Sequence, residues 1–373
     1  SMIHYWIGCK QSMPETPAIE HGKAEESTSN SADADQSPQN IQTDDQCLGR
    51  RVQPYDSSIL KIDHRKIASI GKKIEDFYEG VHDESRELGR SAIGIVRRVT
   101  HKSTGIDYAV KIVQVEKIPE DEMQHIRNEV LILCDVDHPN VIRLQEVFET
   151  KKLIYIVQEL CEGGDLAGLL TDKAYALNRV LDPDLWERRC AEYTKQMLSG
   201  LQYLHSKGII HRDLKLENVL FKSKGPDSEL KIIDFDLSTH FQPGQRHQES
   251  VGTLYTAAPE LLKRDYDERC DIWSIGVMVY VLLSGTAPFG GCYGEKEKAP
   301  IIKNILQGYY DLQSPTLWAN VSPEAKSFIR KLLVKSKNKR ATITEAQKLP
   351  WLQKDSGKSR APSPTSVSSF PTL

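Results

Sequence analysis

The feature that most constrains this chain is the polar run His-Arg-Asp-Leu-Lys-Leu-Glu-Asn over residues 211–218. Asp213, Lys215 and Asn218 bring an acid, a cation and an amide into one short loop. Another acid, Asp234, opens the later triplet Asp-Phe-Asp, which ends at Asp236. Side chains of these types can together hold a hydroxyl, a phosphoryl group and divalent metal ions. We therefore expect a fold that presents both segments at one site.

The composition limits the broad class of protein. The chain has 373 residues, 39% of them hydrophobic and 27% charged, as in ordinary globular proteins. A formal net charge of -3 argues against general affinity for nucleic acid or for membrane surfaces. The seven cysteines show no Cys-x-x-Cys spacing, which argues against a zinc site and favours a reducing, cytoplasmic compartment. The longest apolar run, residues 272–283, is too short to span a bilayer and indicates a buried helix.

Composition also divides the chain into segments. Residues 1–58 are polar, and we expect disorder because they cannot bury enough surface to offset the entropy of ordering. Residues 59–75 form a basic leader in which Ile67, Ile70 and Ile74 would share one face of a helix. This leader either packs on the following domain or binds a partner. Residues 76–352 form the main domain, and the Ser/Pro-rich residues 353–373 are interpreted as a tail or a truncation.

Within the main domain, the pattern changes near residue 160. Residues 76–160 contain short β-branched runs, with one helical stretch over residues 122–135. From Leu166 onward, helical patterns dominate. The sequence therefore predicts an α+β fold, mainly β over residues 76–160 and mainly helical over residues 161–352.

Three further motifs precede the polar run. Residues 88–96, Leu-Gly-Arg-Ser-Ala-Ile-Gly-Ile-Val, suit a hairpin whose glycines let the backbone approach phosphates, although a plain turn gives the same pattern. Lys111 lies in an apolar β run, where its ammonium either meets an anion or snorkels at an edge. Residues 155–166 indicate a buried strand that leads into a Gly-Gly segment, which a simple turn capped by Asp165 would also explain.

With these motifs, residues 76–352 resemble a eukaryotic-type protein kinase. Matching segments that follow the polar run are residues 230–239, 251–253, 257–260, 266–276, 282–289 and 350–352. Within that family the chain is most similar to the calcium/calmodulin-dependent group, especially the calcium-dependent kinases of plants and protists. The resemblance implies the two-lobed protein kinase fold, a monomer, and phosphoryl transfer from ATP to protein substrates with the help of two Mg²⁺ ions.

The resemblance also implies catalytic roles. Asp213 would orient or deprotonate the substrate hydroxyl, and Lys215 would neutralise the transferring phosphoryl group and favour Ser/Thr substrates. Asn218 and Asp234 would bind magnesium. The catalytic set is completed by a Lys111–Glu129 pair, in which Lys111 also contacts ATP phosphates. Residues expected to contact the nucleotide are Leu88, Gly89, Arg90, Ser91, Gly94, Val96, Ala109, Lys111, Gln158, Glu159, Cys161, Asp165, Glu217, Leu220 and Asp234.

Some implied contacts are more specific. The backbone of Glu159 and Cys161 would bond the adenine, with Gln158 at the rear of the pocket, where its amide needs a hydrogen-bond partner. Asp165 would lie at the pocket mouth, near the ribose and the substrate. Glu260 would pair with Arg340 inside the large lobe, unless that arginine is an uninvolved surface residue.

The chain departs from the family at several points. Ser91 replaces a glycine, and residues 173–188 form a longer segment than usual. Asp236 also replaces a glycine; it adds negative charge near the metal site, although Asp tolerates left-handed backbone angles. No EF-hand calcium loop occurs in the sequence, so calcium control would need calmodulin or a missing EF-hand extension.

Two functional expectations follow, with one alternative. Glu249 would hold Arg212 as a phosphorylated residue does in many kinases, which predicts activity without phosphorylation of the activation segment. The acids Asp165 and Glu217, with Glu162 nearby, predict substrates that carry Arg or Lys upstream of the phosphoacceptor. The alternative is a pseudokinase scaffold that binds nucleotide but transfers little phosphate, because Ser91, Gln158 and Asp236 differ from the family pattern.

Overall fold

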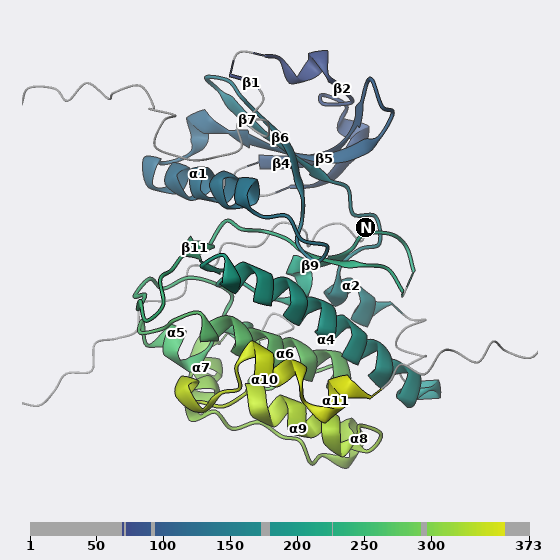
Figure 1. Ribbon diagram of the computed structural model, residues 1–373, viewed down its shortest axis with the longest axis vertical. Coiled ribbons are helices and arrows are strands. Elements are labelled where there is room, and N and C mark those ends of the chain that lie inside the picture. Colours follow the sequence, from purple (N-terminus) through teal and green to yellow (C-terminus); the bar gives the residue numbers. More distant parts are fainter. Residues whose placement is uncertain are drawn as a thin grey trace, which may run out of the picture. The chain divides into compact units, whose positions relative to one another are not determined.

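The computed structural model describes residues 69–70, 72–90, 94–172, 180–225, 227–291 and 297–354 (Figure 1). The polar segment 1–58, most of the leader, Ser91 and nearly all of the tail lie outside the described residues. The described part is an α+β fold in which a β-rich lobe precedes a helical lobe, as the sequence predicts.

One curled sheet forms the first lobe. Its strands are β1 (Ser69–Ile70), β2 (Tyr78–Glu79), β3 (Glu87–Arg90), β4 (Gly94–His101), β5 (Asp107–Gln114), β6 (Leu144–Glu149) and β7 (Leu153–Glu159). They run in the order β1-β6-β7-β5-β4-β2, and β3 pairs with β4. All the pairings are antiparallel except the parallel pair β1–β6. Helix α1 (Glu120–Asp135) lies beside this sheet (Figure 1).

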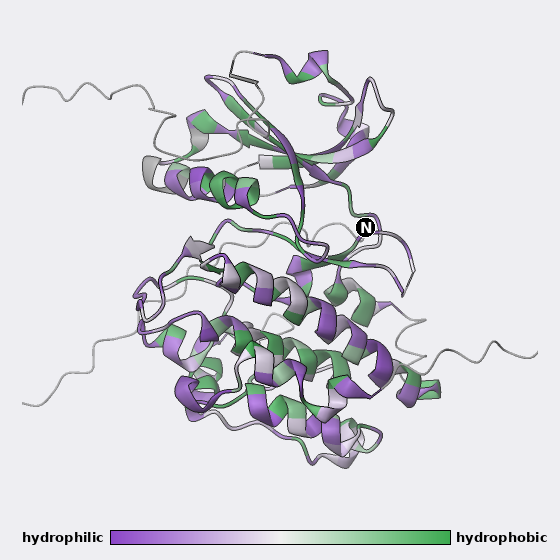
Figure 2. Cartoon of the chain, viewed as in Figure 1, coloured by the Kyte–Doolittle hydropathy of each residue, from purple (hydrophilic) through white to green (hydrophobic). Residues whose placement is uncertain are grey.

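Apolar side chains cover both faces of the sheet. Val110 and Ile112, two residues apart on β5, face a cluster that includes Tyr78 and Phe148. The next residue, Val113, points to the other face and joins the larger core, to which α1 also contributes. Figure 2 shows both hydrophilic and hydrophobic residues along α1, as expected for a helix that buries one face and exposes the other.

The leader differs in part from the helix that the sequence predicts. Ser69 and Ile70 form strand β1, paired in parallel with Phe148 and Glu149 of β6, so the helical interpretation is wrong there. Pairing along β6 satisfies backbone groups that a helix would satisfy internally. Ile74 opens a short 3-10 turn and is buried in the lobe's core. The described end of the leader therefore packs on the domain.

The second lobe consists mainly of helices. They are α2 (Leu166–Thr171), α4 (Pro183–Ser206), α5 (Pro259–Leu262), α6 (Arg269–Ser284), α7 (Lys298–Gln307), α8 (Pro315–Trp318), α9 (Pro323–Leu332), α10 (Ile343–Gln347) and α11 (Pro350–Gln353). Short strands β8 (Ile209–Ile210), β9 (Val219–Phe221), β10 (Leu230–Ile232) and β11 (Thr239–His240) form two small sheets, β9–β10 and β8–β11. Short 3-10 helices are η1 (Ile74–Asp76), η2 (Glu84–Arg86), η3 (Val115–Lys117), η4 (Leu216–Asn218), η5 (Leu254–Thr256) and η6 (Lys337–Lys339).

Helix α6 is the centre of this lobe. Its residues from Cys270 to Ser284 are all buried, which confirms the buried helix predicted for the apolar run. It ends at Gly285, whose left-handed backbone (φ 77°) suits glycine. Helix α4 packs against α6. It is capped by Asp182, whose Oδ1 accepts a hydrogen bond from Leu185 N at 2.9 Å. Among the described helices, none combines the length and the apolar character needed to cross a membrane.

Candidate active site

The polar loop between β8 and β9 gathers the three side chains that the sequence singles out. Lys215 Nζ donates to Asp213 Oδ2 at 2.7 Å and to Thr253 Oγ1 at 3.1 Å. Asn218 Nδ2 donates to the Asp213 carbonyl at 2.9 Å. The other carboxylate oxygen of Asp213, Oδ1, is buried and has no hydrogen-bond partner among the described residues. A buried acceptor without a donor is a natural position for the hydroxyl of a substrate.

Asp271, in the first turn of α6, holds the polar loop in place through hydrogen bonds to its backbone. Its carboxylate accepts hydrogen bonds from the backbone nitrogens of His211 and Arg212, each at 2.9 Å, and from His205 Nε2 at 2.9 Å. Burial alone would raise the pKa of Asp271, but the hydrogen bond from His205 and the donors of His211 lower it. Arg212 is held at φ 67°, an uncommon angle for arginine. Asp271 appeared in the sequence only as part of a motif, and its anchoring role was missed.

Gly252 in the activation segment packs directly on this loop. A Cβ atom at this position would lie 2.4 Å from the Arg212 carbonyl oxygen, and the backbone has φ 93°. The glycine of the Val-Gly-Thr motif is therefore required by close backbone approach to the loop that carries Asp213.

Lys111 forms the predicted pair with Glu129 of α1. Its Nζ lies 2.9 Å and 3.1 Å from the two carboxylate oxygens of Glu129. A third contact was not predicted: Asp236 Oδ1 lies 2.5 Å from the same nitrogen. Burial disfavours the ammonium, but the carboxylates of Asp236 and Glu129 outweigh it and raise the pKa of Lys111. Burial and the carboxylate of Asp236 also raise the pKa of Glu129 well above its usual range.

The Asp-Phe-Asp triplet lies beside this cluster, and its first residue has a left-handed backbone. The left-handed angle falls on Asp234 (φ 68°), whereas Asp236 is not among the described non-glycine residues with positive φ. The tolerance of aspartate for left-handed angles is therefore not used at Asp236. Phe235 is fully buried and contacts the His211 ring at 5.2 Å between centroids. Burial and the neighbouring Asp236 carboxylate raise the pKa of Asp234.

The strand register brings together most of the expected nucleotide residues. Val96 on β4 is opposite Lys111, and Ala109 on β5 is opposite Gln158. Leu220, in the middle of β9, bridges to Asp165. The remaining positions lie on neighbouring segments: Leu88, Gly89 and Arg90 on β3, Gly94 on β4, Glu159 at the end of β7, Cys161 after it, and Glu217 in η4.

Two of these residues have structural roles beside the expected ones. A Cβ atom on Gly94 would lie 2.2 Å from the Ile112 carbonyl oxygen, so this glycine is needed for strand packing whatever it does with phosphates. Arg90 lies at the protein surface and pairs with Glu87, with its Nε 2.7 Å from Oε1.

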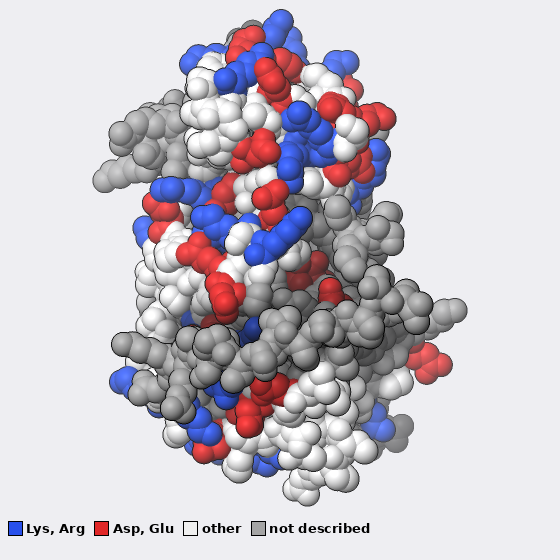
Figure 3. Space-filling model, turned by 90° about the vertical axis from the view of Figure 1, so that its right-hand side faces the viewer, with Lys and Arg blue, Asp and Glu red and all other residues white. Residues whose placement is uncertain are grey.

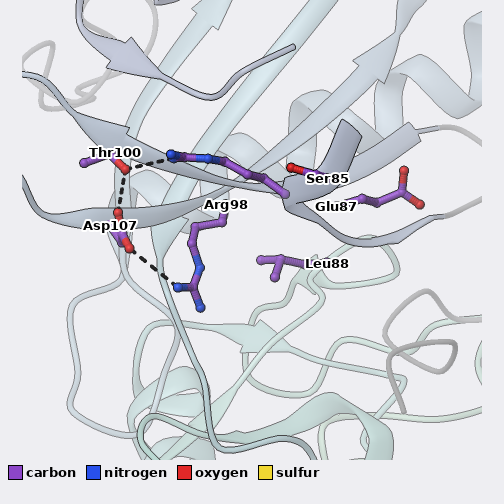
Figure 4. A pocket seen from close by; sticks show the side chains of 7 residues that line it. Ser85, Glu87, Leu88, Arg98, Thr100 and Asp107 are labelled. Carbon is purple, nitrogen blue, oxygen red and sulfur yellow. Dashed lines mark hydrogen bonds and ion pairs between the residues drawn. The ribbon is translucent and has the colours of Figure 1, made fainter. Parts of the chain in front are cut away.

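A pocket of about 440 Å³ lies beside strands β3 and β4. It is lined by Ser85, Arg86, Glu87, Leu88, Arg98, Thr100 and Asp107. Leu88 and Arg98 face each other across it in Figure 4, and Arg98 Nη1 lies 3.6 Å from Asp107 Oδ2. Leu88 thus contributes to the wall of this pocket, whose polar lining is largely paired within itself.

The strand β7 and the segment after it contain the residues that are expected to contact adenine. Gln158 is buried, but the hydrogen-bond partner expected for its amide is not found among the described residues. The side chain of Glu159 is engaged, because Oε1 accepts from Arg143 N at 2.9 Å and lies 3.1 Å from Lys231 Nζ. Burial raises the pKa of the Cys161 thiol to about 12, so the thiol stays protonated at neutral pH.

The three acids proposed to attract basic substrates each have a partner. Asp165 Oδ1 caps α2 by accepting from Gly168 N at 2.6 Å, and burial raises its pKa. Glu217 Oε2 accepts from the Tyr255 hydroxyl at 2.7 Å. Glu162 forms an ion pair with Arg98 at 2.6 Å, which reduces the charge it can offer a substrate. On the face shown in Figure 3, basic and acidic side chains are interspersed over the described surface.

Two longer-range pairs occur as the sequence predicts. Arg212 Nη1 lies 3.5 Å from Glu249 Oε2 and donates to the Tyr266 hydroxyl at 3.0 Å. Arg340 makes a buried bidentate ion pair with Glu260: Nη1 lies 2.5 Å from Oε1, and Nη2 lies 3.0 Å from Oε2. The first pair joins the activation segment to the polar loop, and the second stabilises the helical lobe.

Comparison with known proteins agrees with this geometry. A family model of the protein kinase domain matches residues 82–352, and the chain belongs to that family. It is 36% identical over 288 residues to calcium-dependent protein kinase 1 of Oryza sativa subsp. japonica, covering 77% of this chain and 53% of that protein. It is 38% identical over 275 residues to calcium-dependent protein kinase 29 of Arabidopsis thaliana, covering 73% and 49%. The chain thus spans about half the length of these relatives, and the resemblance stated from sequence is confirmed.

Proposed function

We propose that this protein is a Ser/Thr protein kinase that transfers the γ-phosphoryl group of Mg-ATP to protein hydroxyls. The observation that carries the proposal is the Asp213–Lys215 pair, with a buried oxygen of Asp213 left without a donor. Asp213 would orient the substrate hydroxyl and accept its proton. Lys215 lies close enough to stabilise negative charge that develops beside it.

The residues present also fit magnesium. Asn218 uses its amide nitrogen within the loop, which directs its carbonyl oxygen elsewhere, and Asp234 supplies a carboxylate. The described residues contain no cluster of three or more His, Cys, Asp or Glu side chains placed for a metal. An amide and one carboxylate suit Mg²⁺, which usually completes its shell with water and phosphate oxygens. When bound, the metal would neutralise phosphate charge.

The test is phosphoryl transfer to a peptide that carries basic residues before a Ser or Thr. The purified protein should label the peptide from γ-labelled ATP in the presence of Mg²⁺. Asp213→Asn is nearly isosteric and should abolish most of the transfer while leaving nucleotide binding in place. A rate that stays the same in Asp213→Asn would refute the role of this residue.

A pseudokinase scaffold is the second candidate, and a specific observation favours it. Lys111, the residue that would contact ATP phosphates, already has two carboxylate partners. The same assay decides between the two candidates. Nucleotide binding without any transfer above the Asp213→Asn level would favour the scaffold.

We further propose substrates with Arg or Lys upstream of the phosphoacceptor, recognised chiefly by Asp165 and Glu217. The ion pair of Glu162 with Arg98 makes that residue a weaker contributor. A peptide library that shows no preference for basic residues would contradict this. We also propose that Glu249 lets the enzyme work without phosphorylation of the activation segment.

Regulation by calcium is proposed from the relatives, whose names describe them as calcium-dependent. A calcium titration of transfer, with and without calmodulin, separates three possibilities. Response to calcium alone would indicate a sensor within the protein, response only with calmodulin would indicate a separate sensor, and no response would indicate another control. A cytoplasmic location and a monomeric state stay predictions.

A further inference from the structure

The carboxylate of Asp236 takes up the last hydrogen-bond donor of Lys111. A lysine ammonium has three N–H donors. Two point to the oxygens of Glu129, at 2.9 Å and 3.1 Å, and Asp236 Oδ1 lies 2.5 Å away. All three donors are thus engaged within the protein. A phosphate oxygen can bond this ammonium only if one of the two carboxylates gives way.

Asp236 is the partner that can give way. The side chain of Glu129 is 2% exposed and gives both oxygens to Lys111. That of Asp236 is 20% exposed, contacts Lys111 through one oxygen and also shares a hydrogen bond with the Glu129 side chain. Glu129 also belongs to the long helix α1, so it moves only with that element. Rotation of the Asp236 side chain would break its contacts with Lys111 and Glu129 and free the third donor.

Contacts of the neighbouring residues hold the backbone at Asp236 in place, and this determines where its side chain begins. Before it, Phe235 is buried against His211. After it, the Leu237 carbonyl accepts from Arg212 Nε at 2.5 Å, and the Ser238 carbonyl accepts from Asn128 Nδ2 at 2.7 Å. The carboxylate is therefore directed at Lys111 by contacts with both the polar loop and α1.

The charge balance opposes an incoming polyphosphate. Around one ammonium lie the carboxylates of Glu129 and Asp236, with Asp234 close enough to act on Lys111 electrostatically. A nucleotide triphosphate would add several negative charges to a partly buried region where charges are weakly screened. Removal of the Asp236 charge should then favour any ligand whose phosphates approach Lys111.

We propose that Asp236 is an internal competitor for the phosphates of the nucleotide, and that its displacement from Lys111 sets the affinity of this kinase for ATP. The inference rests on the proposed function in one respect, because it assumes that Lys111 faces the polyphosphate. It predicts that Asp236 weakens the binding of nucleotides but not of a nucleoside. Adenosine lacks phosphates, so its binding should not require the contact to open.

Calorimetric titration of the full chain with ATP, ADP and adenosine tests this directly. Titrations in EDTA exclude any contribution of Asp236 to metal binding. Asp236→Asn should lower the Kd for ATP and ADP about tenfold, as expected when a charged hydrogen-bond competitor is lost, and leave the Kd for adenosine unchanged. Asp236→Gly provides a second variant in case the amide disturbs the cluster.

A matched control is Glu116→Gln, which removes one negative charge from an exposed pair with Lys152 in the same lobe. It should leave all three affinities unchanged. The proposal is overturned if Asp236→Asn fails to strengthen ATP binding, or if adenosine gains as much as ATP, which would indicate general opening of the pocket. Because these are binding measurements, absence of phosphoryl transfer would refute the proposed function without deciding this inference.

Discussion

The pair between Arg212 and Glu249 offers a quantitative test of how the activation segment is held. Glu249→Gln removes the charge but keeps an acceptor near the Tyr266 hydroxyl, which lies 3.3 Å from Glu249 Oε2. Arg212 would retain its bonds to the Leu237 carbonyl and to Tyr266. The substitution therefore weakens one contact of a network and leaves the others in place.

The size of the effect follows from distance and exposure. Two unit charges 3.5 Å apart attract by about 1 kcal/mol in water and by about 5 kcal/mol at an effective dielectric constant near 20. The Glu249 side chain is 60% exposed, so the lower figure applies. Measured exposed pairs contribute about 0.2–1 kcal/mol. If the whole of this contribution positions the polar loop, kcat/KM should fall about 1.4-fold to fivefold.

The assay is the initial rate of peptide phosphorylation by protein that has been treated with a phosphatase. The decrease should shrink at high salt, because screening weakens a solvent-exposed pair. Glu324→Gln removes another exposed carboxylate, paired with Lys354 at 3.2 Å in the same lobe, and should leave the rate unchanged. An unchanged rate in Glu249→Gln would refute the pairing as a functional contact. A loss beyond about a hundredfold, well above the energy of an exposed pair, would show that Glu249 does something else.

Three further outcomes are expected. Arg340→Met leaves the buried carboxylate of Glu260 without its partner. This should lower the free energy of unfolding by about 3–5 kcal/mol and the Tm by roughly 6–20 °C. A Tm shift under about 2 °C would contradict the argument. Gly252→Ala places a Cβ atom against the Arg212 carbonyl and should reduce kcat about a hundredfold by displacing the loop; normal kcat would exclude that clash. Cys161, with its pKa raised to about 12, should react with iodoacetamide at pH 8 about a hundredfold more slowly than a free thiol. Mass spectrometry of the labelled peptide measures this rate, and labelling as fast as that of a free thiol would contradict the raised pKa.

Contacts of charged side chains that require a partner could be predicted from the sequence. An ammonium within an apolar strand needs an anion, which pointed to Lys111 and Glu129. Arg212 likewise required an acceptor, and Glu249 was the acid at a suitable place in the chain. The structure brings both pairs within ion-pair distance. These predictions succeeded because each depends on residue type and on motif spacing.

Other features depend on the path of the backbone, which the motifs do not specify. The sequence suggested a helix around Ile70, but the structure has a strand, because β6 offers an edge for pairing. The sequence indicated that Asp236 could tolerate a left-handed angle, but only the structure shows that this angle falls on Asp234. Asp271 was visible in a motif, yet only the packing of α6 under the loop shows that its carboxylate holds His211 and Arg212.

The sequence by itself determined the protein's class and its reactive groups, because the run over residues 211–218 and Asp234 combines residue types that phosphoryl transfer requires. The tertiary structure decided which hydrogen-bond partners these groups have. It left one oxygen of Asp213 without a donor and gave every donor of Lys111 a carboxylate. The physical reason is that hydrogen-bond saturation depends on where distant segments meet in space, and Asp236 meets Lys111 only after both lobes have folded.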